Sequence, residues 1–237
     1  MKRVVLDTYE EMCKAAAELY VEQLKNKPDS VLGLATGSTP IGLYEELVRR
    51  YDAKEVDFSK ARSFNLDEYY PLKKSHEQSY DYFMRSYLLD KINMSQSDIP
   101  NGEAADTAIE CKRYDAEIQK AGGIDLMLLG LGHNGHIGFN EPDVIYNMGT
   151  YETALTESSI TANSRFFVNG DVQPTRALTM GLGEIFRSKA IILLISGEGK
   201  APIAKKLFEG KVYTDIPASF LLLHQNVTVF LDKAAAG

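Results

Sequence analysis

The sequence predicts an α/β fold with a mainly parallel sheet, and three observations support this class. Short apolar runs rich in β-branched residues alternate with longer segments of helical period, which is typical of strands joined by crossover helices. Most of these runs are apolar throughout, as expected for strands that helices cover on both faces. Hydrophobic residues make up 44% and charged residues 25%, the ordinary balance for a buried core. We expect one domain over residues 1–237.

The expected elements follow one another along the whole chain. The strands are Val31–Ala35, Ala61–Leu66, Ile124–Leu129, Ala190–Ile195 and Val227–Leu231. The helices are Thr8–Lys25, Pro40–Tyr51, Ser79–Ile92, Thr107–Lys120, Thr175–Phe186 and Gly199–Phe208. Thr8 and Glu11 have the spacing of a capping box, and Pro40 suits a first helical turn. Residues 143–164 are polar and weakly periodic, so we expect a lid there, with a plain surface loop as the alternative.

Charge and cysteine content exclude several classes of function. The formal net charge is −7 and no run of Lys or Arg is dense, so neither nucleic acid nor an anionic membrane is an expected partner. Cys13 and Cys111 lie in charged, helix-patterned segments and form no disulfide framework, which fits a reducing compartment. No run of about 18 apolar residues occurs, so we expect a soluble protein of the cytoplasm.

Ligands of a parallel sheet bind at the carboxyl ends of its strands, so the segments after the strands are the candidate site. Thr36, Gly37, Ser38 and Thr39 follow the first expected strand and open a helix, where backbone N–H groups favour an anion such as phosphate. The alternative is a tight turn in which Ser38 or Thr39 caps the helix. The order of a Walker A loop, GxxxxGK[ST], is absent.

Two acids, Asp67 and Glu68, follow the expected strand Ala61–Leu66. Neighbouring residues in extended backbone point in opposite directions, so at most one of the two faces the site. A carboxylate in that place is a candidate base for removing a proton from carbon. The alternative is a pair of solvated loop acids.

The segment GLGHNGHIGFNEP, residues 130–142, follows the strand Ile124–Leu129. Its glycines match the dinucleotide pattern GxGxxG, but no helix opens behind them, so we reject that interpretation. A crowd of imidazole, amide and carboxylate groups favours proton transfer, with His as the group that titrates near neutral pH. These groups belong to His133, Asn134, His136, Asn140 and Glu141. A metal held by His133, His136 and Glu141 is a weaker alternative, because the spacing is not that of a helical HExxH site.

Lys200 lies in the segment SGEGKAPIAKK, in the expected first turn of a helix. A cation there opposes the helix dipole, and an anionic ligand would resolve the conflict. Arg165, in ANSRFF, is a second candidate cation for the same ligand. Lys205 and Lys206 fit exposed lysines of a soluble helix better than Lys200 does.

Seven segments together resemble the glucosamine-6-phosphate deaminase (isomerase) family in order and spacing. They are LGLATGSTP, FNLDEY, LGLGHNGHIGFNEP, ANSRFF, ALTMG, SGEGKA and PASFLLLH, and the resemblance covers nearly the whole chain. The resemblance implies a Rossmann-like three-layer α/β/α sandwich. It also implies conversion of glucosamine 6-phosphate and water into fructose 6-phosphate and ammonia, without a metal or an organic cofactor. It leaves the oligomeric state open, from monomer to hexamer.

The resemblance also implies roles for individual residues. Asp67 becomes the proton acceptor at C2 of the sugar, and His136 the acid and base that opens the ring. Asn134 and Glu141 become the relay that orients His136. The residues that would hold the sugar phosphate are Thr36, Gly37, Ser38, Thr39, Arg165 and Lys200.

The chain departs from its relatives in two ways that affect the expected function. Many relatives carry Asp at the position of Asn134, and an amide orients an imidazole without stabilising its charged form, so Glu141 must do that alone. Tyr151 and Thr153 stand where regulated members use basic residues, so we expect no activation by N-acetylglucosamine 6-phosphate. Galactosamine-6-phosphate deaminases share much of the SGEGK and PASFL pattern, and 6-phosphogluconolactonase-type hydrolases share the fold, so both activities remain alternatives.

Overall fold

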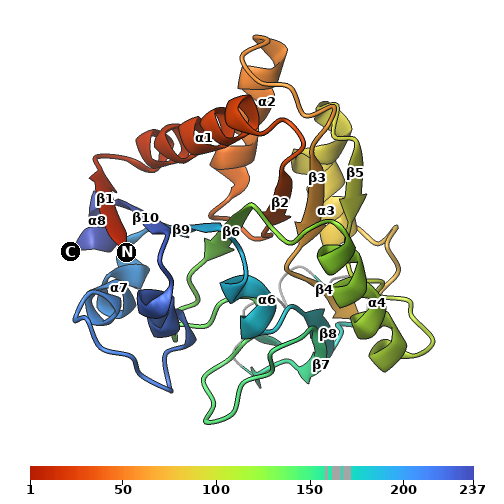
Figure 1. The fold of residues 1–237 in the computed structure, drawn as a ribbon. Coiled ribbons are helices and arrows are strands. Elements are labelled where there is room, and N and C mark those ends of the chain that lie inside the picture. Colours follow the sequence, from red (N-terminus) through yellow and green to blue (C-terminus); the bar gives the residue numbers. More distant parts are fainter. Residues whose placement is uncertain (158–159, 162–166, 168–171) are drawn as a thin grey trace.

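A computed structural model describes residues 1–157, 160–161, 167 and 172–237, and its centre is a parallel sheet (Figure 1). In the described part of the chain the sheet has seven strands in the order β1-β10-β9-β6-β2-β3-β5, and every neighbouring pair is parallel. The strands are β1 (Lys2–Leu6), β2 (Val31–Leu34), β3 (Arg62–Asn65), β5 (Gln96–Asp98), β6 (Leu126–Gly130), β9 (Ala190–Ile195) and β10 (Val227–Asp232).

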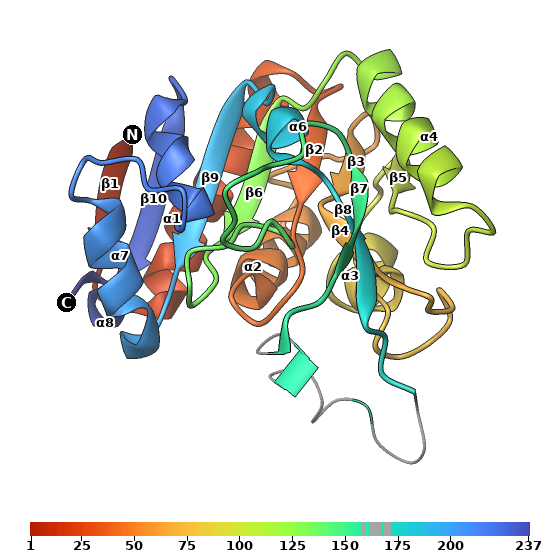
Figure 2. The same ribbon diagram turned by 90° about the horizontal axis from the view of Figure 1, so that it is seen from below.

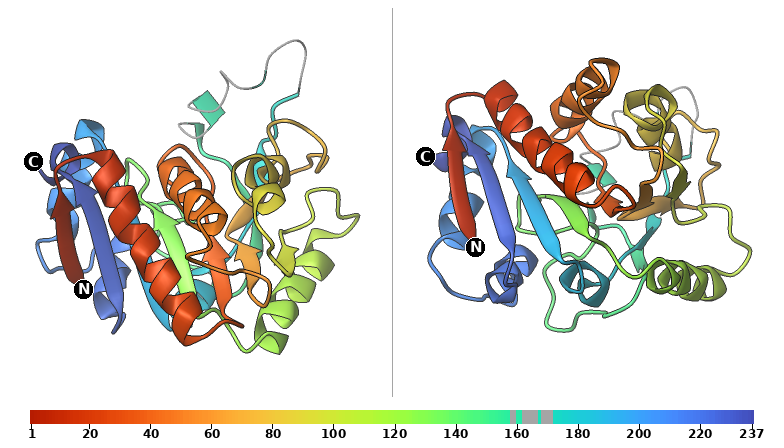
Figure 3. Two further views of the ribbon diagram at one scale, coloured as in Figure 1. Left: turned by 90° about the horizontal axis from the view of Figure 1, so that it is seen from above. Right: turned by 45° about the horizontal axis from the view of Figure 1, so that its top comes forward.

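Helices cover both faces of this sheet, which makes three layers (Figure 3). One face carries α1 (Tyr9–Asn26), α2 (Ile41–Asp52) and α3 (Tyr80–Tyr87), and the other carries α4 (Thr107–Lys120), α6 (Leu182–Phe186) and α7 (Ala201–Leu207). A short last helix, α8 (Lys233–Ala236), follows β10. Residues 127–129 of β6 and 192–193 of β9 are completely buried, because helices pack on both sides of the central strands. The fold class that the sequence predicts is therefore confirmed.

The helix starts agree with the capping signals in the sequence. The Thr8 hydroxyl accepts a hydrogen bond from the Glu11 N–H at 3.2 Å, and the Glu11 carboxylate accepts one from the Asp7 N–H at 3.1 Å. Pro40 occupies the position directly before α2. The Thr8 hydroxyl thus satisfies a backbone N–H group that the start of α1 leaves without a partner, whereas Pro40 makes no side-chain cap on α2.

A second, antiparallel sheet of three strands lies beyond the carboxyl ends of the main sheet and was not expected. Its order is β4 (Asp67–Tyr70), β8 (Arg176–Thr179), β7 (Tyr151–Ala154), and the three strands lie side by side in Figure 2. The predicted helix Thr175–Phe186 is wrong in its first part, which forms β8. Ala177 and Leu178 are completely buried there, and α6 begins only after Gly181.

Part of the predicted lid, residues 143–164, is regular structure. Residues 151–154 form the paired strand β7 instead of an irregular excursion. The entry to β7 is fixed to α4, because the Thr150 N–H and hydroxyl both donate to the Asp115 carboxylate. Alternation over these four residues is too short to predict a strand, and the role of the segment as a lid stays a prediction.

Candidate active site

The predicted site segments meet at one edge of the main sheet. Because β9, β6 and β2 are neighbours and parallel, the segments that follow them leave the sheet side by side. Lys200 follows β9, residues 131–142 follow β6, and Thr36–Thr39 follow β2. Asp67 comes two residues after the end of β3, the next strand in the sheet. Strand order alone therefore gathers residues that are far apart in the sequence.

Asp67 is a buried carboxylate, 6% exposed, at the start of β4. Burial, and to a smaller extent the nearby charge of Glu68, together raise the pKa of Asp67 to about 8. A Cβ atom built on Gly138 would lie 3.5 Å from Asp67 Oδ2, so the carboxylate lies against the loop after β6. A carboxylate with a raised pKa is a strong enough base to take a proton from carbon near neutral pH.

Glu68 points away from Asp67 and toward α3. Its carboxylate accepts hydrogen bonds from the Tyr69, Tyr80 and Asp81 N–H groups at 2.8, 2.9 and 3.0 Å. The bonds to Tyr80 and Asp81 anchor the first turn of α3 on β4. Alternation along β4 thus separates the two acids, and Glu68 has a scaffold position.

The loop after β6 brings His136, Glu141 and Asn134 into contact. Nδ1 of His136 lies 3.1 Å from Oε1 of Glu141, and the Asn134 amide donates to Oε2 of Glu141 at 2.6 Å. The backbone N–H of His136 also donates to Asn134 Oδ1 at 3.2 Å. Nδ1 has no well-aligned hydrogen bond among the described residues, so its contact with Glu141 is that of an ion pair formed when the imidazole is protonated.

Gly132 leaves the room that the imidazole occupies. A Cβ atom on residue 132 would lie 2.3 Å from Cδ2 of His136, closer than any real contact. The Gly132 N–H donates to the His136 carbonyl at 2.9 Å and closes the loop. This glycine therefore serves close packing in the loop and is no part of a nucleotide fingerprint.

Two polar residues outside the predicted site tie this loop to β8. The Thr179 hydroxyl accepts a hydrogen bond from the Phe139 N–H at 3.1 Å. The Asn140 amide donates to the Ile137 and Met180 carbonyls, each at 2.9 Å. Both residues are completely buried. The sequence does not single out Thr179, because its segment is predicted as part of a helix, and the enrichment of Thr in strands is the one signal for β8.

The segment Thr36–Thr39 is partly exposed at the start of α2. The Tyr9 hydroxyl donates to the Thr39 carbonyl at 2.9 Å and accepts from the Gly42 N–H at 2.8 Å, so α1 holds this turn in place. Neither Ser38 nor Thr39 makes a side-chain cap on α2. Their hydroxyl groups therefore do not serve the role that the alternative interpretation gave them.

Lys200 is a half-buried cation, and no carboxylate pairs with it in the described part of the chain. Burial lowers the pKa of Lys200 to about 8. The turn before it is held by Asp232, which accepts hydrogen bonds from the Ser196 hydroxyl and the Gly197 N–H. An ammonium group that loses water without gaining a carboxylate is suited to bind an anion.

The remaining predictions concern Arg165, His133 and a metal site. Arg165, the second expected cation, lies outside the described residues. His133 is exposed and close to the Lys200 turn, since a Cβ atom on Gly199 would lie 3.6 Å from its Cε1. Among the residues that the structure describes, no group of three or more His, Cys, Asp or Glu has the arrangement of a metal site.

Comparison with known proteins identifies the class to which this fold and site belong. The protein has an α/β fold with a parallel main sheet, and polar loops follow the carboxyl ends of its strands. The chain belongs to the family of glucosamine-6-phosphate isomerases and 6-phosphogluconolactonases, whose model matches residues 7–230. In the described part, no helix is long and apolar enough to cross a membrane.

Relatives and solved structures divide into a near and a distant group. A glucosamine-6-phosphate deaminase of Clostridium perfringens is 51% identical, over 100% of this chain and 98% of its own. One from a Thermoanaerobacter species is 50% identical, over 100% and 94%. A solved monomeric glucosamine-6-phosphate deaminase has a TM-score of 0.96 at 44% identity, over 100% and 99% of the two chains. The 6-phosphogluconolactonase of Thermotoga maritima shares the fold, with a TM-score of 0.77 at 18% identity over 98% and 99%.

Proposed function

We propose that this protein is a glucosamine-6-phosphate deaminase, which converts glucosamine 6-phosphate and water into fructose 6-phosphate and ammonia. The observation that carries the proposal is a buried carboxylate of raised pKa, Asp67, against a loop that pairs His136 with Glu141. The near relatives of that name, at about half identity over the full length, support the same substrate. The reaction belongs to the catabolism of amino sugars.

His136 has the role of opening the pyranose ring. Ring opening needs a group that gives a proton to the ring oxygen and takes one from the hydroxyl at C1. Glu141, whose Oε1 lies 3.1 Å from Nδ1, orients the imidazole and leaves Nε2 for the sugar. Asn134 holds the second oxygen of Glu141 and so fixes the direction of the pair.

Asp67 has the role of moving a proton from C2 to C1. The open-chain aldehyde makes the C2 proton acidic, and its removal gives an enolamine. Return of the proton to C1 leaves an iminium at C2, water adds to that carbon, and ammonia leaves as the ketone forms. One carboxylate serves both carbons because they are adjacent.

The phosphate of the substrate is the ligand for the cations and N–H groups at the edge of the sheet. Lys200 is a half-buried cation without a carboxylate partner among the described residues, and Arg165 is the second proposed contact. Thr36, Gly37, Ser38 and Thr39 supply hydroxyl and backbone donors at the start of α2. The free, buried thiols of Cys13 and Cys111 support a reducing location, and we place the enzyme in the cytoplasm.

The test is the release of ammonia from purified protein given glucosamine 6-phosphate, with galactosamine 6-phosphate and 6-phosphogluconolactone as parallel substrates. We expect ammonia and fructose 6-phosphate from the first. Faster release of ammonia from galactosamine 6-phosphate would make that sugar the preferred substrate and leave the proposed reaction unchanged. Hydrolysis of the lactone without any release of ammonia would overturn the proposal.

A further inference from the structure

The buried side chain of Asn140 connects the loop after β6 to the second sheet. Its amide nitrogen donates to the carbonyls of Ile137, in the loop, and Met180, directly after β8. Its side-chain oxygen, Oδ1, accepts a hydrogen bond from the hydroxyl of Tyr151, in β7, at 3.3 Å. Since Asn140 is completely buried, each of these bonds replaces a bond to water that the side chain has lost. Movement of Asn140 would break several of them together.

Tyr151 reaches this junction because of strand register. It lies directly opposite Thr179 across β7 and β8, and Asp67 lies opposite the same Thr179 across β4 and β8. Residues that are paired in this way project from the same face of a sheet. The second sheet therefore presents Asp67, Thr179 and Tyr151 as one row toward the loop. Burial raises the pKa of Tyr151 to about 12, so its hydroxyl remains a donor at neutral pH.

The strand that carries Tyr151 is held on both sides of it by α4. Thr150, the residue before, donates to Asp115, and Glu152, the residue after, accepts from the Thr107 hydroxyl at 2.6 Å. Arg176 of β8 also donates to Glu152, at 2.6 Å. These contacts fix the backbone on either side of position 151.

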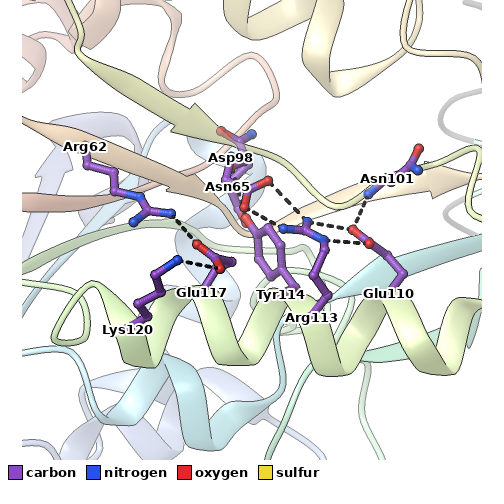
Figure 4. Close-up of polar contacts among 9 residues, drawn as sticks. All are labelled: Arg62, Asn65, Asp98, Asn101, Glu110, Arg113, Tyr114, Glu117 and Lys120. Atoms are coloured by element: carbon purple, nitrogen blue, oxygen red, sulfur yellow. Dashed lines mark hydrogen bonds and ion pairs between the residues drawn. The ribbon is translucent and has the colours of Figure 1, made fainter.

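Helix α4 is in turn fixed to the main sheet, as Figure 4 shows. Arg113 pairs with Asp98 of β5 at 2.8 Å, and the Tyr114 hydroxyl donates to the Asn65 carbonyl of β3 at 2.6 Å. Arg62 of β3 pairs with Glu117 at 3.1 Å. Tyr151 is thus attached to the rigid centre of the molecule through α4.

The residue after Asn140 is Glu141, the charged partner of His136. We propose that Tyr151 is a positioning residue, which holds Asn140 and thereby keeps the Glu141 carboxylate against the His136 imidazole. This inference rests on the proposed function, since it assigns Tyr151 a part in that reaction. Tyr151 acts through the loop and touches neither His136 nor Glu141 in the contacts described above. Loss of its hydroxyl lowers the rate of reaction without weakening the binding of the sugar phosphate.

The first experiment compares Tyr151→Phe with the matched control Tyr70→Phe. Tyr70 belongs to the same small sheet, and its hydroxyl donates to the Ala104 carbonyl, away from the loop. We expect Tyr151→Phe to lower kcat about 10-fold with an unchanged KM, since small displacements of a catalytic group reduce rates strongly. We expect Tyr70→Phe to leave kcat unchanged. An unchanged kcat in Tyr151→Phe, or a rise in KM alone, would overturn the proposal.

A double-mutant cycle then tests the route through Glu141. In a Glu141→Gln background, Tyr151→Phe has no further effect on kcat if Tyr151 acts through the carboxylate. An equal loss of kcat in both backgrounds contradicts that route.

Hydrogen exchange of the peptide that contains residues 137–141 gives a readout that needs no activity. We expect faster exchange in Tyr151→Phe than in wild type and no change in Tyr70→Phe, and unchanged exchange would contradict the anchor itself. Wild type without deaminase activity would refute the proposed function, and the exchange rates would still decide whether Tyr151 anchors the loop.

Discussion

Asp67 lies directly opposite Thr179 across the antiparallel pair of β4 and β8. The Thr179 hydroxyl accepts a hydrogen bond from the Phe139 N–H, so one residue of β8 faces Asp67 and also holds the loop that carries His136. The second sheet therefore fixes the position of Asp67, the proposed C2 base, relative to His136, the proposed ring-opening group. Substitutions in this sheet should affect catalysis even where they do not touch the substrate.

Thr179→Val keeps the shape of the side chain but removes the acceptor of the Phe139 N–H. A buried donor left without a partner costs about 1–3 kcal/mol. We expect a lower urea midpoint and a reduced kcat, measured together on the purified variant. Thr153→Val, in β7 of the same sheet, is the control, because its hydroxyl contacts only the neighbouring Ala154 carbonyl among its described bonds. Equal effects of both variants would contradict a special role for Thr179.

Asp67→Asn should stabilise the fold as the pH rises. Burial raises the pKa of Asp67 from 3.8 to about 8, so ionisation opposes folding between these two values. Wild type therefore loses this contribution to stability as the pH increases through that range, and the neutral amide does not. We expect the difference in Tm to grow in favour of Asp67→Asn from pH 4 to pH 8, by about 2–4 °C for each kcal/mol. A difference that stays constant with pH would contradict the raised pKa.

Glu68→Gln should move the acidic limb of the activity profile. The charge of Glu68 raises the pKa of Asp67, and the base must be ionised to work. Without that charge the pKa of Asp67 falls, so kcat/KM should persist to lower pH. The variant should also be less stable, because the Glu68 carboxylate accepts hydrogen bonds from the N–H groups of Tyr80 and Asp81, and a neutral amide accepts them less strongly. A limb that stays in place while stability falls would limit Glu68 to its scaffold role.

Lys200→Ala should weaken binding of the sugar phosphate, with a KM about 10–100-fold higher and a smaller change in kcat. Lys205→Ala is the matched control, since Lys205 is exposed on α7 a few residues later. Burial lowers the pKa of Lys200 to about 8, so the KM of wild type should rise above that pH as the ammonium loses its charge. The KM of Lys200→Ala should lack this rise. Parallel KM profiles for the two enzymes would exclude Lys200 from the phosphate site.

The sequence predicts the five inner strands of the main sheet and the segments that follow them, because buried parallel strands and their crossover helices leave strong periodic signals. The two edge strands, β1 and β5, were not predicted. The apolar run Ile124–Leu129 clearly predicts a strand, so the sequence also predicts that residues 130–142 form a loop at the end of that strand. The second sheet was not predicted. Its strands of four residues each are half-polar, and β4 pairs with β8 across more than a hundred residues of chain, which local patterns do not record.

The most direct test of the account follows exchange of the C2 proton of glucosamine 6-phosphate with deuterated solvent, in wild type and in Asp67→Asn. In the proposed mechanism Asp67 removes that proton. We therefore expect ready exchange in wild type and an exchange rate at least about 1,000-fold lower in the variant, with the binding of the sugar phosphate retained. Exchange in Asp67→Asn at the rate of wild type would show that the base is another group.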